Sequence, residues 1–120
     1  MLQIDQRQME GFQASARQSF EDRGVVHIRS KAPVESTQYS DDALRERIRL
    51  CMRRCRAYGL ITEAQVMAFV DTSFFLGEWF DLDPAQAWTK EVLQDPELQP
   101  NQKAGVLVGF AETVAEGKRA

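Results

Sequence analysis

The residues that could carry chemistry are few, and the single histidine, His27, limits what they could catalyse. A serine or cysteine nucleophile would need this imidazole as its general base. The sequence contains no Gly-x-Ser-x-Gly segment or comparable setting for a nucleophile. Because His27 stands among Val25, Val26 and Ile28, we expect a hydrogen-bonded structural histidine.

The two cysteines, Cys51 and Cys55, are four residues apart and therefore lie on one face of an expected helix. This spacing could supply half of a zinc site, but the sequence offers no second pair of ligands. Adjacent helical turns also have poor geometry for a disulfide. We expect two buried thiols that pack as small hydrophobic side chains.

An acidic cluster, Glu78, Asp81 and Asp83, resembles the start of a calcium-binding loop. However, no glycine follows at the sharp-turn position, and Asp83 before Pro84 is better suited to cap a helix. The scattered glycines form neither a phosphate-binding loop nor a dinucleotide fingerprint. We therefore expect no metal, no cofactor and no enzymatic activity.

Composition restricts the class of protein further. The chain has 120 residues, of which 43% are hydrophobic and 28% charged, with a net charge of −3. This fits one small folded domain. No apolar run approaches the roughly 18 residues of a membrane span, a signal-peptide core is lacking, and two cysteines are too few for a secreted disulfide scaffold. We expect a cytoplasmic protein that does not contact membranes.

Helical periodicity runs through the whole chain, and no alternating strand pattern competes with it. We predict an all-α fold, a single compact bundle of about five helices over residues 1–120. It comprises a long polar N-terminal helix over residues 1–30, a loop over 31–39 and a helical core over 40–120. The N-terminal helix has a narrow apolar stripe that includes Phe12, Ala16 and Phe20, so it needs a groove in which to dock.

Local signals mark where the later helices begin. Ser40 is an expected N-cap, and Thr62 with Gln65 forms an expected capping box that Ile61 and Val66 would staple. Asp83-Pro84 is expected to open a short helix that Asp95-Pro96 ends. The last helix follows Pro100 and carries Leu107, Phe110 and Val114. Its glycines at positions 105 and 109 either permit close backbone approach or are incidental.

The third helix is apolar on two faces, and Phe75 and Trp79 mark the second of them. Such a helix lies in the middle of a fold or buries one side against a partner. Tryptophan is enriched among the residues that dominate protein interfaces. The second apolar face is therefore a candidate contact surface for another protein.

Charge is unevenly distributed, because the helix over residues 41–56 is rich in arginine whereas residues 59–120 are acidic. The arginines could pair with the acidic half, within or between molecules, or could bind phosphates. No aromatic residues interleave with them for stacking on bases, so we expect a protein partner and no nucleic acid. The residues expected to contact a partner are Phe12, Phe20, Arg49, Arg53, Arg56, Phe75 and Trp79.

Residues 56–103 resemble small all-helical bacterial proteins encoded in type VI secretion effector clusters, beside PAAR spike-tip proteins and adaptors. The similar features are the Arg-Ala-Tyr-Gly turn at 56–59, Thr62-Glu63, Leu76-Gly77, Asp81-x-Asp83-Pro84, Trp88 and Leu93-x-Asp95-Pro96. The N-terminal part is similar more loosely, through Phe20, Arg23, His27 and Arg29.

The resemblance implies a co-adaptor or chaperone-like protein that binds an adaptor or effector for loading onto the secretion spike. An immunity protein that blocks a toxin is the alternative, and a helical nucleic-acid-binding regulator is a third class. A homo-oligomer is compatible with each of these functions. The shared motifs are mostly caps and core positions, so they imply no catalytic residue.

Overall fold

The chain is all-helical, as predicted, in a computed structural model that describes the backbone of residues 6–119. Side chains are described for residues 15–114, 116 and 117, so Phe12 lies outside them. The elements are α1 (Gln6–Lys31), α2 (Asp41–Arg56), α3 (Glu63–Leu76), α4 (Ala87–Gln94) and α5 (Pro100–Arg119), with short 3-10 turns η1 (Phe80–Leu82) and η2 (Pro84–Gln86). The described residues include no strand. The expected length and docking stripe of the N-terminal helix stay predictions over residues 1–14.

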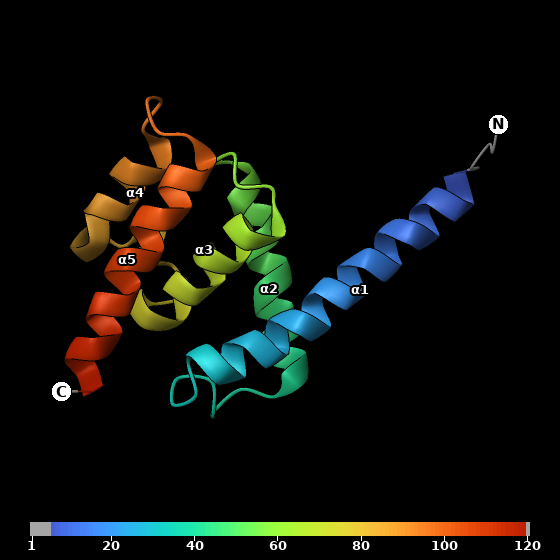
Figure 1. Ribbon diagram of the computed structural model, residues 1–120, viewed down its shortest axis with the longest axis horizontal. Coiled ribbons are helices and arrows are strands. Elements are labelled where there is room, and N and C mark those ends of the chain that lie inside the picture. The colour runs from blue at the N-terminus through green and yellow to red at the C-terminus, as the bar shows by residue number, and fades with distance from the viewer. Residues whose placement is uncertain (1–5, 120) are drawn as a thin grey trace.

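Helix α3 is the centre of the fold. It contacts α1, α2 and α5, and Figure 1 shows α2 and α5 on opposite sides of it. Phe69, Val70 and Phe75 are buried, although they point to different sides of the helix. The apolar surface around α3 is therefore covered by the chain itself, which is the first of the two arrangements that the sequence allows.

Capping interactions begin α2 and α3 where the sequence predicts. The Ala43 amide donates to Ser40 Oγ at 3.1 Å. The Gln65 amide donates to Thr62 Oγ1 at 3.2 Å, and the Thr62 amide donates to Gln65 Oε1 at 3.2 Å, which completes the capping box. The expected staple is wrong, because Ile61 is 78% exposed.

Helix α1 docks on α2 through a close contact at Gly24. A Cβ atom at this position would lie 2.6 Å from Ile48 Cδ1 and 3.0 Å from Met67 Cε. Phe20 and Ile28 bury their side chains on the same side of α1. Ala16 is exposed, so the predicted stripe is wrong at that position. Gly24 permits the close packing of α1 on α2 because it has no side chain, and a search for apolar periodicity does not detect a glycine.

The segment that follows α3 departs most from the sequence prediction. Asp83 Oδ1 accepts a hydrogen bond from the Ala85 amide at 2.9 Å, as expected of a cap, but it caps η2, and α4 begins only at Ala87. In α5, no atom lies within 4 Å of where a Cβ of Gly105 or Gly109 would be, so neither glycine permits a close approach. Phe110 is exposed.

Candidate protein-binding surface

The residues expected to contact a partner do not form one surface. Phe20 and Phe75 are 5% and 3% exposed, so both belong to the hydrophobic core. Trp79 is 50% exposed. Arg49, Arg53 and Arg56 are exposed on α2. The burial of the two phenylalanines corrects the prediction, because the chain's own helices cover the face on which they lie.

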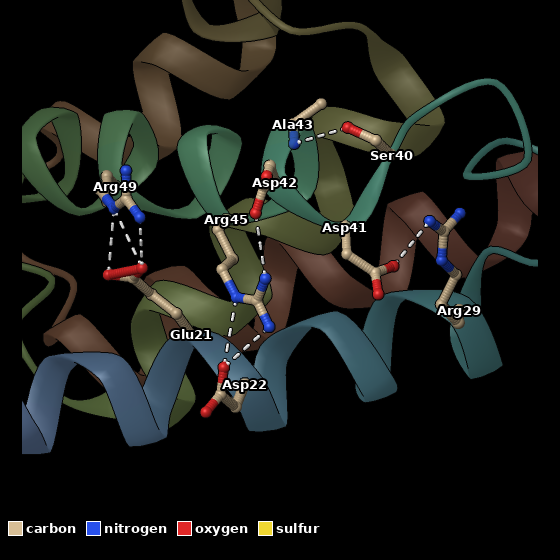
Figure 2. Close-up of polar contacts among 9 residues, drawn as sticks. All are labelled: Glu21, Asp22, Arg29, Ser40, Asp41, Asp42, Ala43, Arg45 and Arg49. Atoms are coloured by element: carbon tan, nitrogen blue, oxygen red, sulfur yellow. Dashed lines mark hydrogen bonds and ion pairs between the residues drawn. The ribbon is translucent and has the colours of Figure 1, made fainter.

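Two arginines of α2 fasten this helix to α1. Arg49 Nε donates to Glu21 Oε1 at 3.0 Å, and the Glu21 carboxylate is almost fully buried. Arg45 Nη2 donates to Asp22 Oδ1 at 3.0 Å. Figure 2 shows both guanidinium groups of α2 directed at carboxylates of α1. The expected pairing with the acidic C-terminal half is wrong for these two residues.

Arg47 is a buried residue of the core rather than part of a basic surface. Its guanidinium donates to Ser73 Oγ and to the Tyr39 hydroxyl, each at 3.1 Å. It also lies over the ring of Phe74, 4.5 Å from the ring centroid. This arginine therefore joins α2 to α3 and to the loop before α2, and it is not available to an external anion.

Arg54 forms the fourth internal attachment, and it holds Trp79. Its guanidinium pairs with the buried carboxylate of Asp81 and donates to the Glu78 carbonyl oxygen at 2.7 Å. The Tyr58 hydroxyl donates to the other Asp81 oxygen at 2.6 Å. Burial lowers the pKa of Arg54. The same guanidinium lies 4.3 Å from the centroid of the Trp79 ring, so it stacks on that ring.

Trp79 borders a hollow of about 230 Å³ in the segment that follows α3. Leu76, Phe80 and Leu82 line it as well, and Leu82 is 57% exposed. A second hollow shares Leu82 and Asp83 with the first and is lined further by residues of η2 and α4. We call the exposed residues around both hollows the Trp79 surface. It consists of Gly77, Trp79, Leu82, Asp83, Pro84, Ala87, Lys90, Glu91 and Gln94.

His27 and Asp71 form the most conspicuous polar pair outside this surface. His27 Nε2 lies 2.8 Å from Asp71 Oδ2, which links α1 to α3. Burial raises the pKa of Asp71, against the opposing effect of the hydrogen bond with His27. The arrangement fits the expected structural histidine, since the imidazole is engaged by a side chain of a neighbouring helix.

The thiols of Cys51 and Cys55 are buried and unpaired, as expected. Burial raises the pKa of Cys51 to about 11 and that of Cys55 further, so neither is a reactive thiolate at neutral pH. In the part of the chain that the structure describes, no three histidine, cysteine or acidic residues are grouped to hold a metal ion. None of its helices combines the length and apolarity of a membrane span.

The Arg54–Asp81 pair confirms, for this arginine, the expected pairing of the arginine-rich helix with the acidic C-terminal half, although the sequence did not indicate which two residues would meet. Asp81 drew attention only as part of a calcium-like cluster, and Arg54 only as one arginine among several. The only signal for this pair in the sequence is that Arg54 and Tyr58 are four residues apart. This spacing lets both side chains reach the same carboxylate, that of Asp81. No protein-family model, curated protein or solved structure matches this chain.

Proposed function

We propose that this protein is a protein-interaction module that binds its partner through the Trp79 surface. The observation that carries the proposal is the half-exposed indole of Trp79, stacked on Arg54 beside an apolar hollow. A large aromatic side chain that is already immobilised loses little entropy on binding, and tryptophan is among the commonest residues to dominate binding energy.

The biological role that we propose is that of a co-adaptor or chaperone-like protein for type VI secretion. The support is the resemblance of residues 56–103, a stretch that includes the whole Trp79 surface. In this role the partner is an adaptor or effector encoded in the same gene cluster. The bound module holds that partner in a state that can be loaded onto the secretion spike.

Co-expression with the products of adjacent genes tests the binding function. We expect one of them to co-purify with the unmodified chain, and Leu82→Ala to reduce the recovered complex strongly. Ile61→Ala is the control, because it truncates another exposed aliphatic side chain elsewhere on the molecule. Equal recovery with Leu82→Ala and Ile61→Ala would place the interface elsewhere.

A cell assay separates this role from that of an immunity protein. Deleting a co-adaptor abolishes secretion of the effector but leaves the toxicity of that effector, when it is expressed inside cells, unchanged. Deleting an immunity protein makes the same cells sensitive to the toxin. A nucleic-acid-binding role is disfavoured, because four arginines of α2 are engaged inside the molecule, by Asp22, Ser73, Glu21 and Asp81.

A further inference from the structure

The Trp79 surface carries two exposed carboxylates that have no ion-pair partner in the part of the chain that the structure describes. Asp83 and Glu91 both line the second hollow and are exposed, and neither forms an ion pair with any described residue. Elsewhere Glu21, Asp22 and Asp81 are each paired with an arginine of α2. The exposed apolar side chains of this surface are therefore bordered by negative charge that the fold does not neutralise.

Lys90 lines the same hollow, is exposed and forms no ion pair with a described residue, so it contributes one positive charge against these two carboxylates. The side chain of Glu78, close to Trp79 in the chain, is 43% exposed and lies 3.9 Å from Arg47 Nε, at the limit of an ion pair. Arg54, which stacks on the Trp79 ring, is already engaged by Asp81. The surface as a whole therefore presents apolar area with an excess of carboxylates at its border.

Given the proposed function, on which this inference rests, we propose that the Trp79 surface binds a basic amphipathic helix of the partner. An apolar side chain of that helix enters the hollow between Trp79 and Leu82. Lysine or arginine residues one turn away meet Asp83 and Glu91. Helices dock in grooves through apolar residues at i, i+3, i+4 and i+7, and charges at the border of an interface select the complementary partner.

The test uses the full chain and two labelled synthetic peptides. One is an amphipathic helix of leucine and lysine, and the other has glutamate in place of every lysine. Fluorescence anisotropy measures their affinity at low and at high salt. We expect the lysine peptide to bind, the glutamate peptide not to bind, and affinity for the lysine peptide to fall as salt screens the carboxylates.

Matched variants then locate the binding site. Glu91→Lys should weaken the lysine peptide about fivefold or more, since it replaces an attraction with a repulsion. Leu82→Ala should weaken it by a similar factor, about fivefold, through lost apolar contact. Glu46→Lys and Ile61→Ala make the same changes at other exposed sites, and affinity should stay within about twofold. Circular dichroism verifies that all four variants keep their helical content.

Four results would overturn the proposal. Equal weakening by Glu46→Lys and Glu91→Lys would mean that the peptide responds only to net charge. Comparable binding of the glutamate peptide, or no binding of the lysine peptide, would mean that the surface does not select basic helices. A concentration-dependent dimer in sedimentation, lost in Leu82→Ala, would mean that a second copy of the chain covers the surface.

The same variants separate this proposal from the proposed function. Suppose that an adjacent gene product binds and that Leu82→Ala abolishes this binding, but that neither salt nor Glu91→Lys changes its affinity. The proposed interaction module then stands, and the proposal that the partner segment is a basic helix is wrong. If the lysine peptide shows the expected pattern but no adjacent gene product binds, the basic helix stands and the secretion role is wrong.

Discussion

Replacing Asp81 with asparagine tests whether the Arg54–Asp81 pair supports the segment that presents Trp79. The side chains of Arg54 and Asp81 are only 12% and 3% exposed. An asparagine keeps the shape of the side chain, and its amide oxygen can still accept the hydrogen bond from the Tyr58 hydroxyl. The amide nitrogen then faces the Arg54 guanidinium, so the substitution removes both the negative charge and the hydrogen-bond acceptor opposite Arg54.

The expected cost follows from what Arg54 retains. Removing one partner of a buried ion pair costs about 3–5 kcal/mol, since the other charge is left uncompensated. Arg54 keeps its hydrogen bond to the Glu78 carbonyl oxygen and its contacts with the rings of Phe69 and Trp79. We therefore expect the lower end of that range, about 3 kcal/mol of unfolding free energy, and a fall in Tm of about 10 °C.

Urea unfolding at neutral pH, followed by far-ultraviolet circular dichroism, measures this cost. Glu91→Gln is the matched control, because it makes the same chemical change on an exposed carboxylate that has no ion pair with a described residue. The control should change the unfolding free energy by less than about 0.5 kcal/mol. The reasoning is refuted if Asp81→Asn costs less than about 1 kcal/mol, because a surface pair would cost no more.

Three further predictions concern packing and titration. Gly24→Ala should destabilise the chain by about 1–2 kcal/mol in urea unfolding because its Cβ would collide with buried side chains of other helices, whereas Gly105→Ala, with open space, should stabilise it by about 0.5–1 kcal/mol; a stabilising Gly24→Ala would contradict the contact. Cys51 and Cys55 should resist a thiol reagent at mildly alkaline pH until the chain is unfolded, because burial raises both pKa values; rapid labelling of the native chain would disagree. Burial raises the folded-state pKa of Asp71 above 3.8, so the native state holds that proton more tightly than the unfolded state. The unfolding free energy relative to Asp71→Asn should therefore fall as pH rises from 3.8 through the raised pKa, and a rise would be evidence against the burial effect.

The parts of the fold that the sequence predicts well are those determined within a few residues. Ser40 and the Thr62–Gln65 capping box satisfy backbone amides three residues away, so their partners are visible in the sequence itself. The all-α architecture follows from periodicity for the same reason. In each case the sequence contains both members of the interaction at a fixed short spacing.

The candidate site could not be predicted in the same way, because it depends on where α3 stops. Continued helical spacing would put Phe75 and Trp79 on one face. The helix ends at Leu76, and Gly77 has a φ of +120°, a conformation that glycine adopts readily. The chain turns there, so Phe75 stays in the core while Trp79 reaches the surface.

Long-range pairing explains the remaining differences. Arg49 meets Glu21 across 28 positions of sequence, and Arg45 meets Asp22 across 23. Neither spacing corresponds to a local rule, so charge patterning alone could not choose between α1 and the acidic C-terminal half as the partner. Because α1 docks against α2 at Gly24, the carboxylates of α1 are the ones that Arg45 and Arg49 reach.

These pairings change what the charge of the chain implies about a partner. By sequence, the arginine-rich helix is the natural place for an anion to bind. In the folded chain, Arg45, Arg49 and Arg54 are paired with carboxylates, and the exposed Arg53 and Arg56 form no ion pair with a described residue. Asp83 and Glu91 are likewise unpaired, with Lys90 beside them and exposed apolar side chains around them. A phosphate backbone would be repelled from that surface, and a basic amphipathic segment would gain both apolar contact and charge pairing. The fold thus leaves fewer free arginines on α2 than its composition implies, which is why the proposed interface lies on the segment after α3.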